Sequence, residues 1–202
     1  MPPLHISIFI EQISKNLMSK PIKVCTLLWL FSRDDSPCGN KVLLGMKKRG
    51  FGAGKWNGFG GKVEPGETLQ HAAIREMYEE SRVMVSGVKY VGFLFFEFEG
   101  SPQDLEVHVF SASHHEGVPE ESDEMQPQWF PCDSIPYQEM WEDDVYWVPL
   151  LLEECFFHGK FIFRKDCLLS HDVHRVDEPF IKDPETYVPL CASKPPQTSI
   201  EF

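Results

Sequence analysis

The stretch 61–83 (GKVEPGETLQHAAIREMYEESRV) constrains the fold more than any other part of this chain. Its apolar residues recur three and four positions apart, which is the spacing of one face of an α-helix. Thr68 precedes them, and threonine is a residue type that caps helix N-termini. The pattern predicts a helix over 68–81 whose apolar face packs on a sheet.

Three carboxylates share another face of this predicted helix, because Glu79 and Glu80 lie three and four residues after Glu76. Like charges at this spacing destabilise a surface helix by about 0.2–0.5 kcal/mol per pair, and Arg75 alone does not balance three acids. A divalent cation would supply the missing charge, and carboxylate oxygens favour Mg²⁺, with Mn²⁺ as a substitute. Taken alone, such a run is more often a solvated acidic face.

The residues around these acids indicate a family. Gly61, Glu67 and the run REMYEE at 75–80 resemble the Nudix box, the signature of hydrolases that cleave a nucleoside diphosphate linked to another group. The resemblance implies an α/β/α sandwich, with a mixed β-sheet between helices, in which one of the box glutamates helps to activate the attacking water. It implies that Arg75 and Glu67 brace the loop and the helix, that Arg75, Glu76, Glu79 and Glu80 form the catalytic set, and that the metal is held by Gly60, Gly61, Glu76, Glu79, Glu80 and Glu124.

One position departs from the family pattern. The glycine that the box carries near the end of its helix is Arg82 here. A glycine at that place suits a left-handed backbone conformation, which costs arginine about 1 kcal/mol. The resemblance implies no ligand role for this position, so the departure concerns the way the helix ends more than the activity.

Length and composition bound the organisation of the chain. Its 202 residues, 42% of them hydrophobic, are enough for one domain with a sizeable core. We expect a flexible N-terminal extension at 1–20, a Nudix hydrolase domain at 21–176 and a tail at 177–202. The tail contains prolines and has no hydrophobic periodicity, which is typical of a disordered segment.

Charge and cysteine usage limit the partners and the compartment. The formal net charge of -12 opposes binding to nucleic acid or to an anionic membrane. No apolar run reaches the roughly 20 residues of a membrane helix. Six cysteines are scattered without a CxxC pair, which favours a reducing compartment. We expect a monomer that binds a small nucleotide. We expect it in the cytoplasm, with the nucleus and the mitochondria as further compartments.

Apolar runs separated by turn residues predict the other elements. The runs 24–31 and 42–46, on either side of a turn-rich loop, predict a β-hairpin. The runs 90–98 and 105–110 predict an antiparallel pair. A second packing helix is predicted at 145–156, and shorter strands are predicted at 83–85, 129–130, 161–163 and 168–176.

The resemblance extends from the box to the pocket. The segments VLLGMKKRGFGAGKWNGFGGKVEPGET, FEFEG, ESDEMQPQWF and MWEDDVYWVPLLL are similar to those Nudix hydrolases that convert oxidised purine nucleoside triphosphates to the monophosphate and pyrophosphate. The similarity covers roughly 20–176 and implies 8-oxo-dGTP, 2-hydroxy-dATP and their ribonucleotide forms as substrates. It implies a base edge read by Asn57, Asp143 and Asp144, a ring enclosed by Phe51, Phe96, Trp141 and Trp147, and a rim of Thr26, Lys47 and Leu105. Leu105 replaces the methionine expected at the rim.

The residue types of this pocket suit a purine, which offers a face for stacking and an edge of donors and acceptors. Asp143 and Asp144 are adjacent acids among aromatic residues, so desolvation and mutual repulsion should raise the pKa of at least one of them. Plainer interpretations stay open: Asp144 can simply cap the helix that follows, and Trp141 and Trp147 can be core aromatics. A Nudix hydrolase of another nucleoside diphosphate and a non-catalytic nucleotide-binding module are the alternative functions.

Overall fold

The computed structural model describes residues 20–32 and 40–189. The predicted N-terminal extension, apart from Lys20, and the end of the predicted tail (190–202) lie outside the described residues. Within the described part, no helix combines the length and the apolar character needed to cross a membrane.

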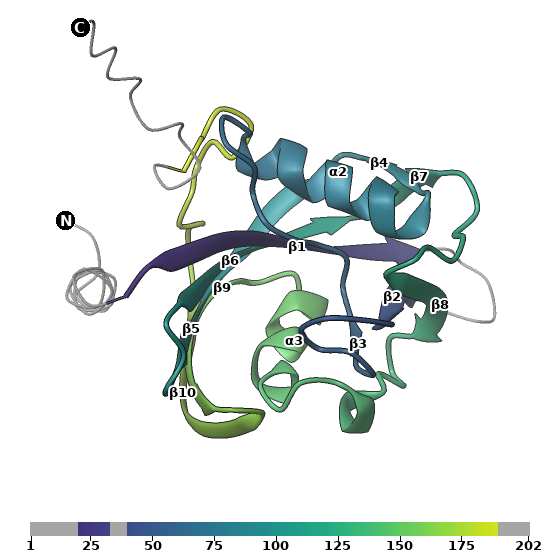
Figure 1. Ribbon diagram of the computed structural model, residues 1–202. Coiled ribbons are helices and arrows are strands. Elements are labelled where there is room, and N and C mark those ends of the chain that lie inside the picture. The colour runs from purple at the N-terminus through teal and green to yellow at the C-terminus, as the bar shows by residue number, and fades with distance from the viewer. Residues whose placement is uncertain (1–19, 33–39, 190–202) are drawn as a thin grey trace, which may run out of the picture.

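A mixed eight-stranded sheet forms the centre of the fold (Figure 1). Its order is β10-β9-β5-β6-β1-β2-β3, and β8 pairs with β2. The β1–β6 and β5–β9 pairs are parallel, while the pairs on either side of them are antiparallel. The strands are β1 (Ile22–Ser32), β2 (Lys41–Lys47), β3 (Trp56–Asn57), β5 (Lys89–Phe98), β6 (Asp104–Ala112), β8 (Met125–Pro131), β9 (Phe156–Arg164) and β10 (Cys167–Val176).

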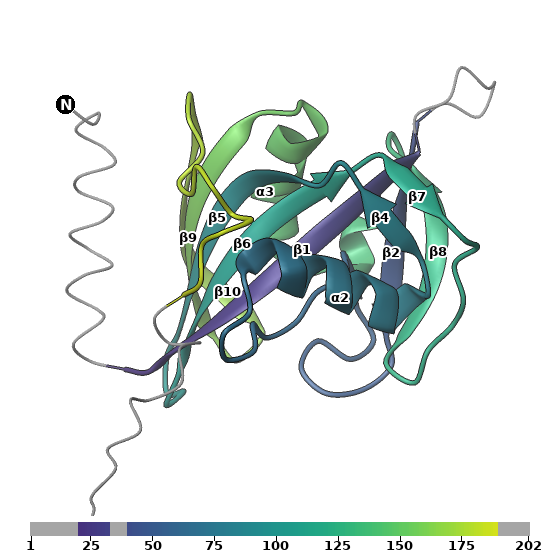
Figure 2. The ribbon, with the colours of Figure 1, turned by 90° about the horizontal axis from the view of Figure 1, so that it is seen from above.

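Helices lie on both sides of this sheet. Helix α2 (Leu69–Ser81) covers one face and α3 (Asp144–Leu152) the other, as Figures 1 and 2 show from two directions. A 3-10 turn (Tyr137–Glu139) precedes α3, and a separate two-stranded sheet joins β4 (Met84–Ser86) to β7 (His114–Glu116). The predicted α/β/α sandwich with a mixed sheet is therefore confirmed.

Each helix buries its apolar side in its own core. On the α2 side, Leu69, Ala72, Ala73 and Met77 are fully buried, as their helical spacing predicts. The core on the α3 side is rich in large aromatic residues, among them Trp29, Trp147, Phe157, Phe161 and Phe163. Burial on both faces explains why the central strands read as continuous apolar runs.

Most predicted elements occur where the sequence placed them, but the predicted helix at 145–156 is wrong at its end. Helix α3 stops at Leu152, and Phe156 already begins β9. The reversal uses Glu154 in a left-handed conformation (φ 58°), and the N–H of Cys155 donates to the carbonyl of Leu150 at 3.0 Å. The apolar run continues through this reversal, so hydrophobic content alone could not locate it.

Residues 177–189 belong to the segment that the sequence analysis placed in the tail, yet they pack against the α2 side of the sheet. Ile181 is only 9% exposed and lies in the same core as α2. The ring centroids of Phe180 and Phe93, which is in β5, lie 4.6 Å apart. This segment lacks helix and strand, which explains why periodicity did not reveal it.

The end of α2 has the geometry expected from the departure at Arg82. Arg82 is left-handed (φ 62°, ψ 16°), and its N–H donates to the carbonyl of Tyr78 at 2.8 Å. We predict that Arg82→Gly raises the free energy of unfolding by about 1 kcal/mol, because glycine has no Cβ to strain there. Urea unfolding measures the change.

Arg82→Ala is the matched control for this prediction. Both variants lose the contact of the guanidinium with the Tyr78 ring, which lies 5.8 Å away, but alanine keeps its Cβ. The difference between the glycine and alanine variants therefore isolates the backbone conformation. Equal stability of the two variants would contradict the strain.

Candidate active site

A cavity of about 1160 Å³ lies between α2, the glycine-rich loop before it, the sheet and the start of α3. Every residue that the sequence analysis assigned to the site lines this cavity. The set comprises Thr26, Lys47, Phe51, Asn57, Gly60, Gly61, Arg75, Glu76, Glu79, Glu80, Phe96, Leu105, Glu124, Trp141, Asp143, Asp144 and Trp147. The carboxylates of α2 lie at one end of the cavity, and the two aspartates with their aromatic neighbours lie at the other.

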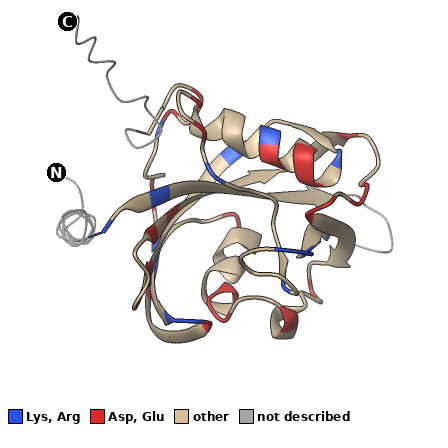
Figure 3. Cartoon of the chain, in the orientation of Figure 1, with Lys and Arg blue, Asp and Glu red and all other residues tan. Residues whose placement is uncertain are grey.

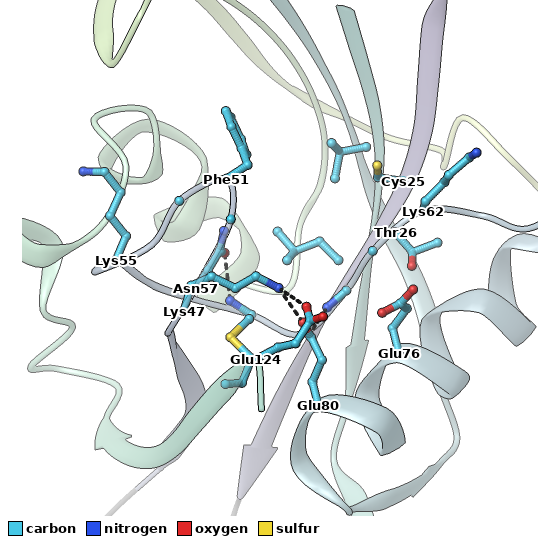
Figure 4. Close-up of a pocket in the computed structure, with 18 of the residues that line it drawn as sticks. Cys25, Thr26, Lys47, Phe51, Lys55, Asn57, Lys62, Glu76, Glu80 and Glu124 are labelled. Atoms are coloured by element: carbon cyan, nitrogen blue, oxygen red, sulfur yellow. Dashed lines mark hydrogen bonds and ion pairs between the residues drawn. The ribbon is translucent and has the colours of Figure 1, made fainter. Parts of the chain in front are cut away.

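Glu80 is the most buried acid of the α2 end, with 4% of its surface exposed. Its Oε1 accepts from Lys47 Nζ and its Oε2 from the N–H of Gly60, both at 2.9 Å (Figure 4). Lys47 Nζ also donates to Glu124 Oε2 at 2.9 Å. Burial raises the pKa of Glu80 although Lys47 and the Gly60 N–H oppose it. The pKa of Lys47 is raised in turn, because its two acids outweigh its own burial.

Arg75 ties the helix to the loop that precedes it. Its Nε and Nη2 hold the two carboxylate oxygens of Glu67, each at 2.9 Å, and Nη2 also donates to the carbonyl of Lys62 at 3.1 Å. Its Nη1 donates to Glu76 at 2.8 Å and to Glu79 at 3.1 Å. The bracing that the family resemblance implied for Arg75 and Glu67 is thus present as a two-pronged ion pair.

The donor chemistry at this end fits a divalent cation. Figure 3 shows acidic residues on α2 and on the segment that leads into β8. Burial, which disfavours the charged form, raises the pKa of both Glu76 and Glu80 although the cationic side chains beside them oppose the rise. Carboxylate oxygens are the ligands that hard divalent ions prefer. Among the residues that the structure describes, however, no three acidic, histidine or cysteine side chains already converge on one point.

The side chains of the four predicted glutamate ligands differ in setting. All four line the cavity. The side chains of Glu76 and Glu80 are largely buried, whereas that of Glu79 is 54% exposed. Glu124 is joined to Glu80 through Lys47, and its pKa is lowered by that hydrogen bond. Each of these four acids already accepts a hydrogen bond from Arg75 or Lys47, so each would exchange part of that contact for a metal ion.

The two predicted glycines are required for a steric reason. A Cβ on Gly61 would collide with the Glu76 carboxylate, and one on Gly60 would collide with the carbonyl of Thr26 in β1. The first obstacle is a side chain and the second is backbone. Glycine at both positions lets the loop approach β1 and the acidic helix at once.

Gly61→Ala should therefore impair activity without unfolding the protein. We predict a fall in kcat of at least about tenfold, or about 1.4 kcal/mol, because the methyl group displaces the Glu76 carboxylate. Thermal unfolding should change little. Gly60→Ala is the contrast, since its methyl group meets backbone and should lower the melting temperature instead. Identical behaviour of the two variants would contradict this assignment.

The other end of the cavity holds the two aspartates, which are 3% and 2% exposed. Asp143 Oδ2 accepts from Trp147 Nε1, and Asp144 Oδ2 accepts from the N–H of Trp141, both at 3.0 Å. Burial raises the pKa of Asp143 to about 6. Burial, followed by the charge of Asp143, raises the pKa of Asp144 well above its ordinary value. The predicted upward shift is confirmed for both acids.

The capping alternative for Asp144 receives only partial support. Asp144 is the first residue of α3, and its carboxylate binds the amide of the turn before the helix. The N-cap residue is Asp143, which makes no side-chain capping bond. One oxygen of Asp144 thus has a structural partner, and burial of two acids at the cavity wall goes beyond what capping requires.

Aromatic rings form the walls next to these acids. Phe51 stacks on Trp141 with centroids 4.9 Å apart and remains 65% exposed, so its ring borders the cavity mouth. Trp147 is buried behind the acids and packs edge-on against Trp29 at 5.5 Å. Phe96 stacks on Phe161 at 5.3 Å. Trp147 is thus both core and cavity wall.

Several cavity residues were not predicted from the sequence, and three of them lie among its aromatic side chains. Phe98 follows Phe96 by two positions in β5 and so shares its face, which the alternation FEF could have revealed. Phe163 lies opposite Phe98 in the parallel β5–β9 pair, which no local pattern predicts. Lys55 lies over the Trp141 ring, 5.1 Å from its centroid.

A family comparison agrees with this fold. A NUDIX domain model matches residues 24–151, and the chain belongs to the Nudix family. The oxidized purine nucleoside triphosphate hydrolase of Mus musculus is 55% identical over 138 residues, which cover 68% of this chain and 88% of the mouse protein. The protein of the same name in Danio rerio is 53% identical over 141 residues, covering 68% of this chain and 87% of its own length.

Solved structures extend the comparison to the fold. A MutT protein from Bacillus halodurans superposes with a TM-score of 0.65 at 25% identity. The match covers 75% of this chain and 97% of the bacterial protein. The sandwich fold is therefore shared with a MutT protein over nearly its whole length.

Proposed function

We propose that this protein hydrolyses oxidised purine nucleoside triphosphates, namely 8-oxo-dGTP, 2-hydroxy-dATP and their ribonucleotide forms, to the monophosphate and pyrophosphate. Such a reaction removes damaged precursors before a polymerase incorporates them. The observation that carries the proposal is one cavity with an acidic end and an aromatic end that holds two buried aspartates with raised pKa values. The names of the mouse and zebrafish relatives support it.

At the aromatic end of the cavity, where we propose that the base binds, the protein offers hydrogen-bonding groups that complement the edge of a purine. A carboxylic acid that keeps its proton near neutral pH both donates and accepts, which suits an edge with donors and acceptors. Asn57 adds an amide, whose Oδ1 accepts from the N–H of Gly58 at 2.8 Å. The Thr26 hydroxyl is buried and finds no hydrogen-bond partner among the described residues, as expected of a group that a ligand completes.

At the phosphate end, the cofactor would be held by the predicted set, Gly60, Gly61, Glu76, Glu79, Glu80 and Glu124, and we propose that it is Mg²⁺ with Mn²⁺ as a substitute. When bound, such an ion polarises phosphoryl oxygens and lowers the pKa of water. Arg75 fixes the orientation of Glu76, and the Gly60 N–H fixes that of Glu80. Lys47 lies between two of these acids and can turn its charge to a phosphate. One of the box glutamates would accept the proton of the attacking water.

Steady-state kinetics on a nucleotide panel with Mg²⁺ test this function. We expect kcat/KM to be higher with 8-oxo-dGTP and 2-hydroxy-dATP than with dGTP, with pyrophosphate as a product. A preference for ADP-ribose, a dinucleoside polyphosphate or a cap would assign another Nudix substrate to the same box. Binding without turnover would indicate a non-catalytic nucleotide-binding module, although all three box glutamates are present.

Assembly and compartment stay predictions. We propose a monomer that acts in the cytoplasm, and the nucleus and mitochondria remain alternatives. The net charge of -12 supports a small nucleotide rather than a nucleic acid as the ligand. Sedimentation and imaging of the tagged full chain measure the two properties.

A further inference from the structure

The C-terminal strap, which we define as residues 177–189, lies beyond the stretch 24–151 that matches the family model. In Figures 1 and 2 it runs beside the end of α2 at which the helix begins. Helix α2 carries the box glutamates. The strap therefore adjoins the element on which the candidate active site depends.

Hydrogen bonds join the strap to the first turn of α2. The first N–H groups of a helix have no partners within the helix and need them elsewhere. The N–H of Leu69 donates to the carbonyl of Tyr187, and that of Gln70 donates to the carbonyl of Pro184, both at 3.2 Å. The third, of His71, donates to Thr68 Oγ1 at 3.3 Å. Two of the first three N–H groups of α2 thus donate to carbonyls of the strap.

A side-chain bond and a turn support these contacts. Gln70 Nε2 donates to Glu185 Oε1 at 3.2 Å. Within the strap, the N–H groups of Thr186 and Tyr187 donate to the carbonyl of Asp183 at 3.4 and 3.1 Å. This turn sets the direction of the carbonyls that meet the helix.

Apolar contacts anchor the strap to the same core as the helix. Ile181 is 9% exposed and belongs to the cluster that contains Leu69, Ala72, Ala73 and Met77. Phe180 packs on Phe93 at 4.6 Å and meets the ring of His158 edge-on at 5.5 Å. Two alanines in the buried face of α2 give shallow ridges, which resist sliding of the helix on the sheet less than large side chains do. The strap is therefore bonded to the first turn of α2 and packed in the core beneath that helix.

We propose that the C-terminal strap positions α2, and thereby sets the placement of the Glu76 and Glu80 carboxylates relative to Lys47 and Gly60. Misplacement of a catalytic constellation by about 1 Å can cost about a hundredfold in rate, even when the cause lies far from the chemistry. The inference rests on the proposed function for its kinetic consequence. Its structural part, the fixing of α2, is independent of the substrate.

The test uses the double variant Phe180→Ala/Ile181→Ala in the full chain, with Lys182→Ala as an exposed control on the strap. Hydrogen exchange should show that the Leu69 and Gln70 amides lose protection at least about tenfold in the double variant, while amides of the central strands keep theirs. The apparent dissociation constant of Mg²⁺ should rise at least about tenfold. With 8-oxo-dGTP as substrate, KM should stay within about twofold of the wild-type value, because the base end does not touch the strap.

A second variant, a chain that ends at Ile181, keeps the apolar anchors and removes the carbonyls of Pro184 and Tyr187. It should show the same loss of α2 protection and the same weaker Mg²⁺ binding. Unchanged protection of the first α2 amides in this shortened chain overturns the proposal. So does a uniform loss of protection throughout the sheet with unaltered Mg²⁺ affinity, since the strap would then only stabilise the fold.

The two proposals fail in different ways. If the wild-type protein binds Mg²⁺ but hydrolyses no oxidised purine nucleotide, the proposed function is wrong. The exchange and the Mg²⁺ titration, measured by calorimetry without nucleotide, still decide whether the strap positions α2.

Discussion

Replacing Glu80 with glutamine is expected to lower kcat on every nucleotide by at least about a hundredfold, or about 2.7 kcal/mol. Each Glu80 oxygen faces a donor, Oε1 meeting Lys47 Nζ and Oε2 meeting the Gly60 N–H. A glutamine keeps the shape, but it brings an NH₂ group toward one of these donors and removes the charge. Loss of a charged ligand should also weaken metal binding.

Binding of the base should survive in Glu80→Gln, because Asp143 and Asp144, the proposed base-reading acids, belong to α3 and the turn before it rather than to α2. Calorimetry with the monophosphate product measures this binding without turnover. Glu116→Gln, at an exposed position in β7, is the matched control and should keep wild-type kcat. A near-normal kcat in Glu80→Gln would exclude a metal-site role for this residue.

The parts of the molecule that the sequence predicted are those with a local pattern. Helix α2 follows from the spacing of Leu69, Ala72 and Met77, and the capping role of Thr68 from its residue type. The site residues follow from the resemblance of the box and the pocket segments to a family, and the structure brings all of them to one cavity. Their individual roles stay predictions until variants are measured.

The parts that the sequence did not predict depend on pairing between distant segments. Phe163 enters the cavity only because β9 pairs in parallel with β5, more than sixty residues earlier in the chain. The packing of 177–189 depends on hydrogen bonds from the first N–H groups of α2 and on burial of Ile181 in the core beneath that helix. Neither cause leaves a periodic signal near the residues concerned.

The second large effect concerns base choice and rests on the two buried aspartates. Each has one oxygen held by a tryptophan: Asp143 by the Trp147 indole and Asp144 by the Trp141 amide. Their raised pKa values favour retention of one proton by the pair at a pH where ordinary aspartates are ionised, and we propose that either acid can carry it. A shared proton lets one pair match the edge of oxidised guanine and, shifted, that of oxidised adenine.

Asp143→Ala and Asp144→Ala should each lower kcat/KM by about one to two decades, because losing a hydrogen-bond partner at a buried edge costs about 1 to 3 kcal/mol. The losses should differ between 8-oxo-dGTP and 2-hydroxy-dATP, since each base uses a different proton position. Asn57→Ala is the contrast: it removes an amide with no proton to exchange and should lower the affinity for both bases alike. Steady-state kinetics across pH measure all three variants.

The pH dependence of the free energy of unfolding gives a second, independent measurement of the proton that Asp143 retains. Since the pKa of Asp143 is about 6 in the folded protein and 3.8 ordinarily, the folded state keeps a proton that the unfolded chain releases. The free energy of unfolding should therefore fall as the pH rises from about 4 to about 6, and this contribution should be constant above. Asp143→Asn should reduce that fall.

The kinetic prediction for Asp143→Ala and Asp144→Ala has a clear contrary outcome. If both variants lose one common factor in kcat/KM on 8-oxo-dGTP, 2-hydroxy-dATP and dGTP, with unchanged pH profiles, the acids only secure the start of α3. A base-reading pair cannot treat three different purine edges equally.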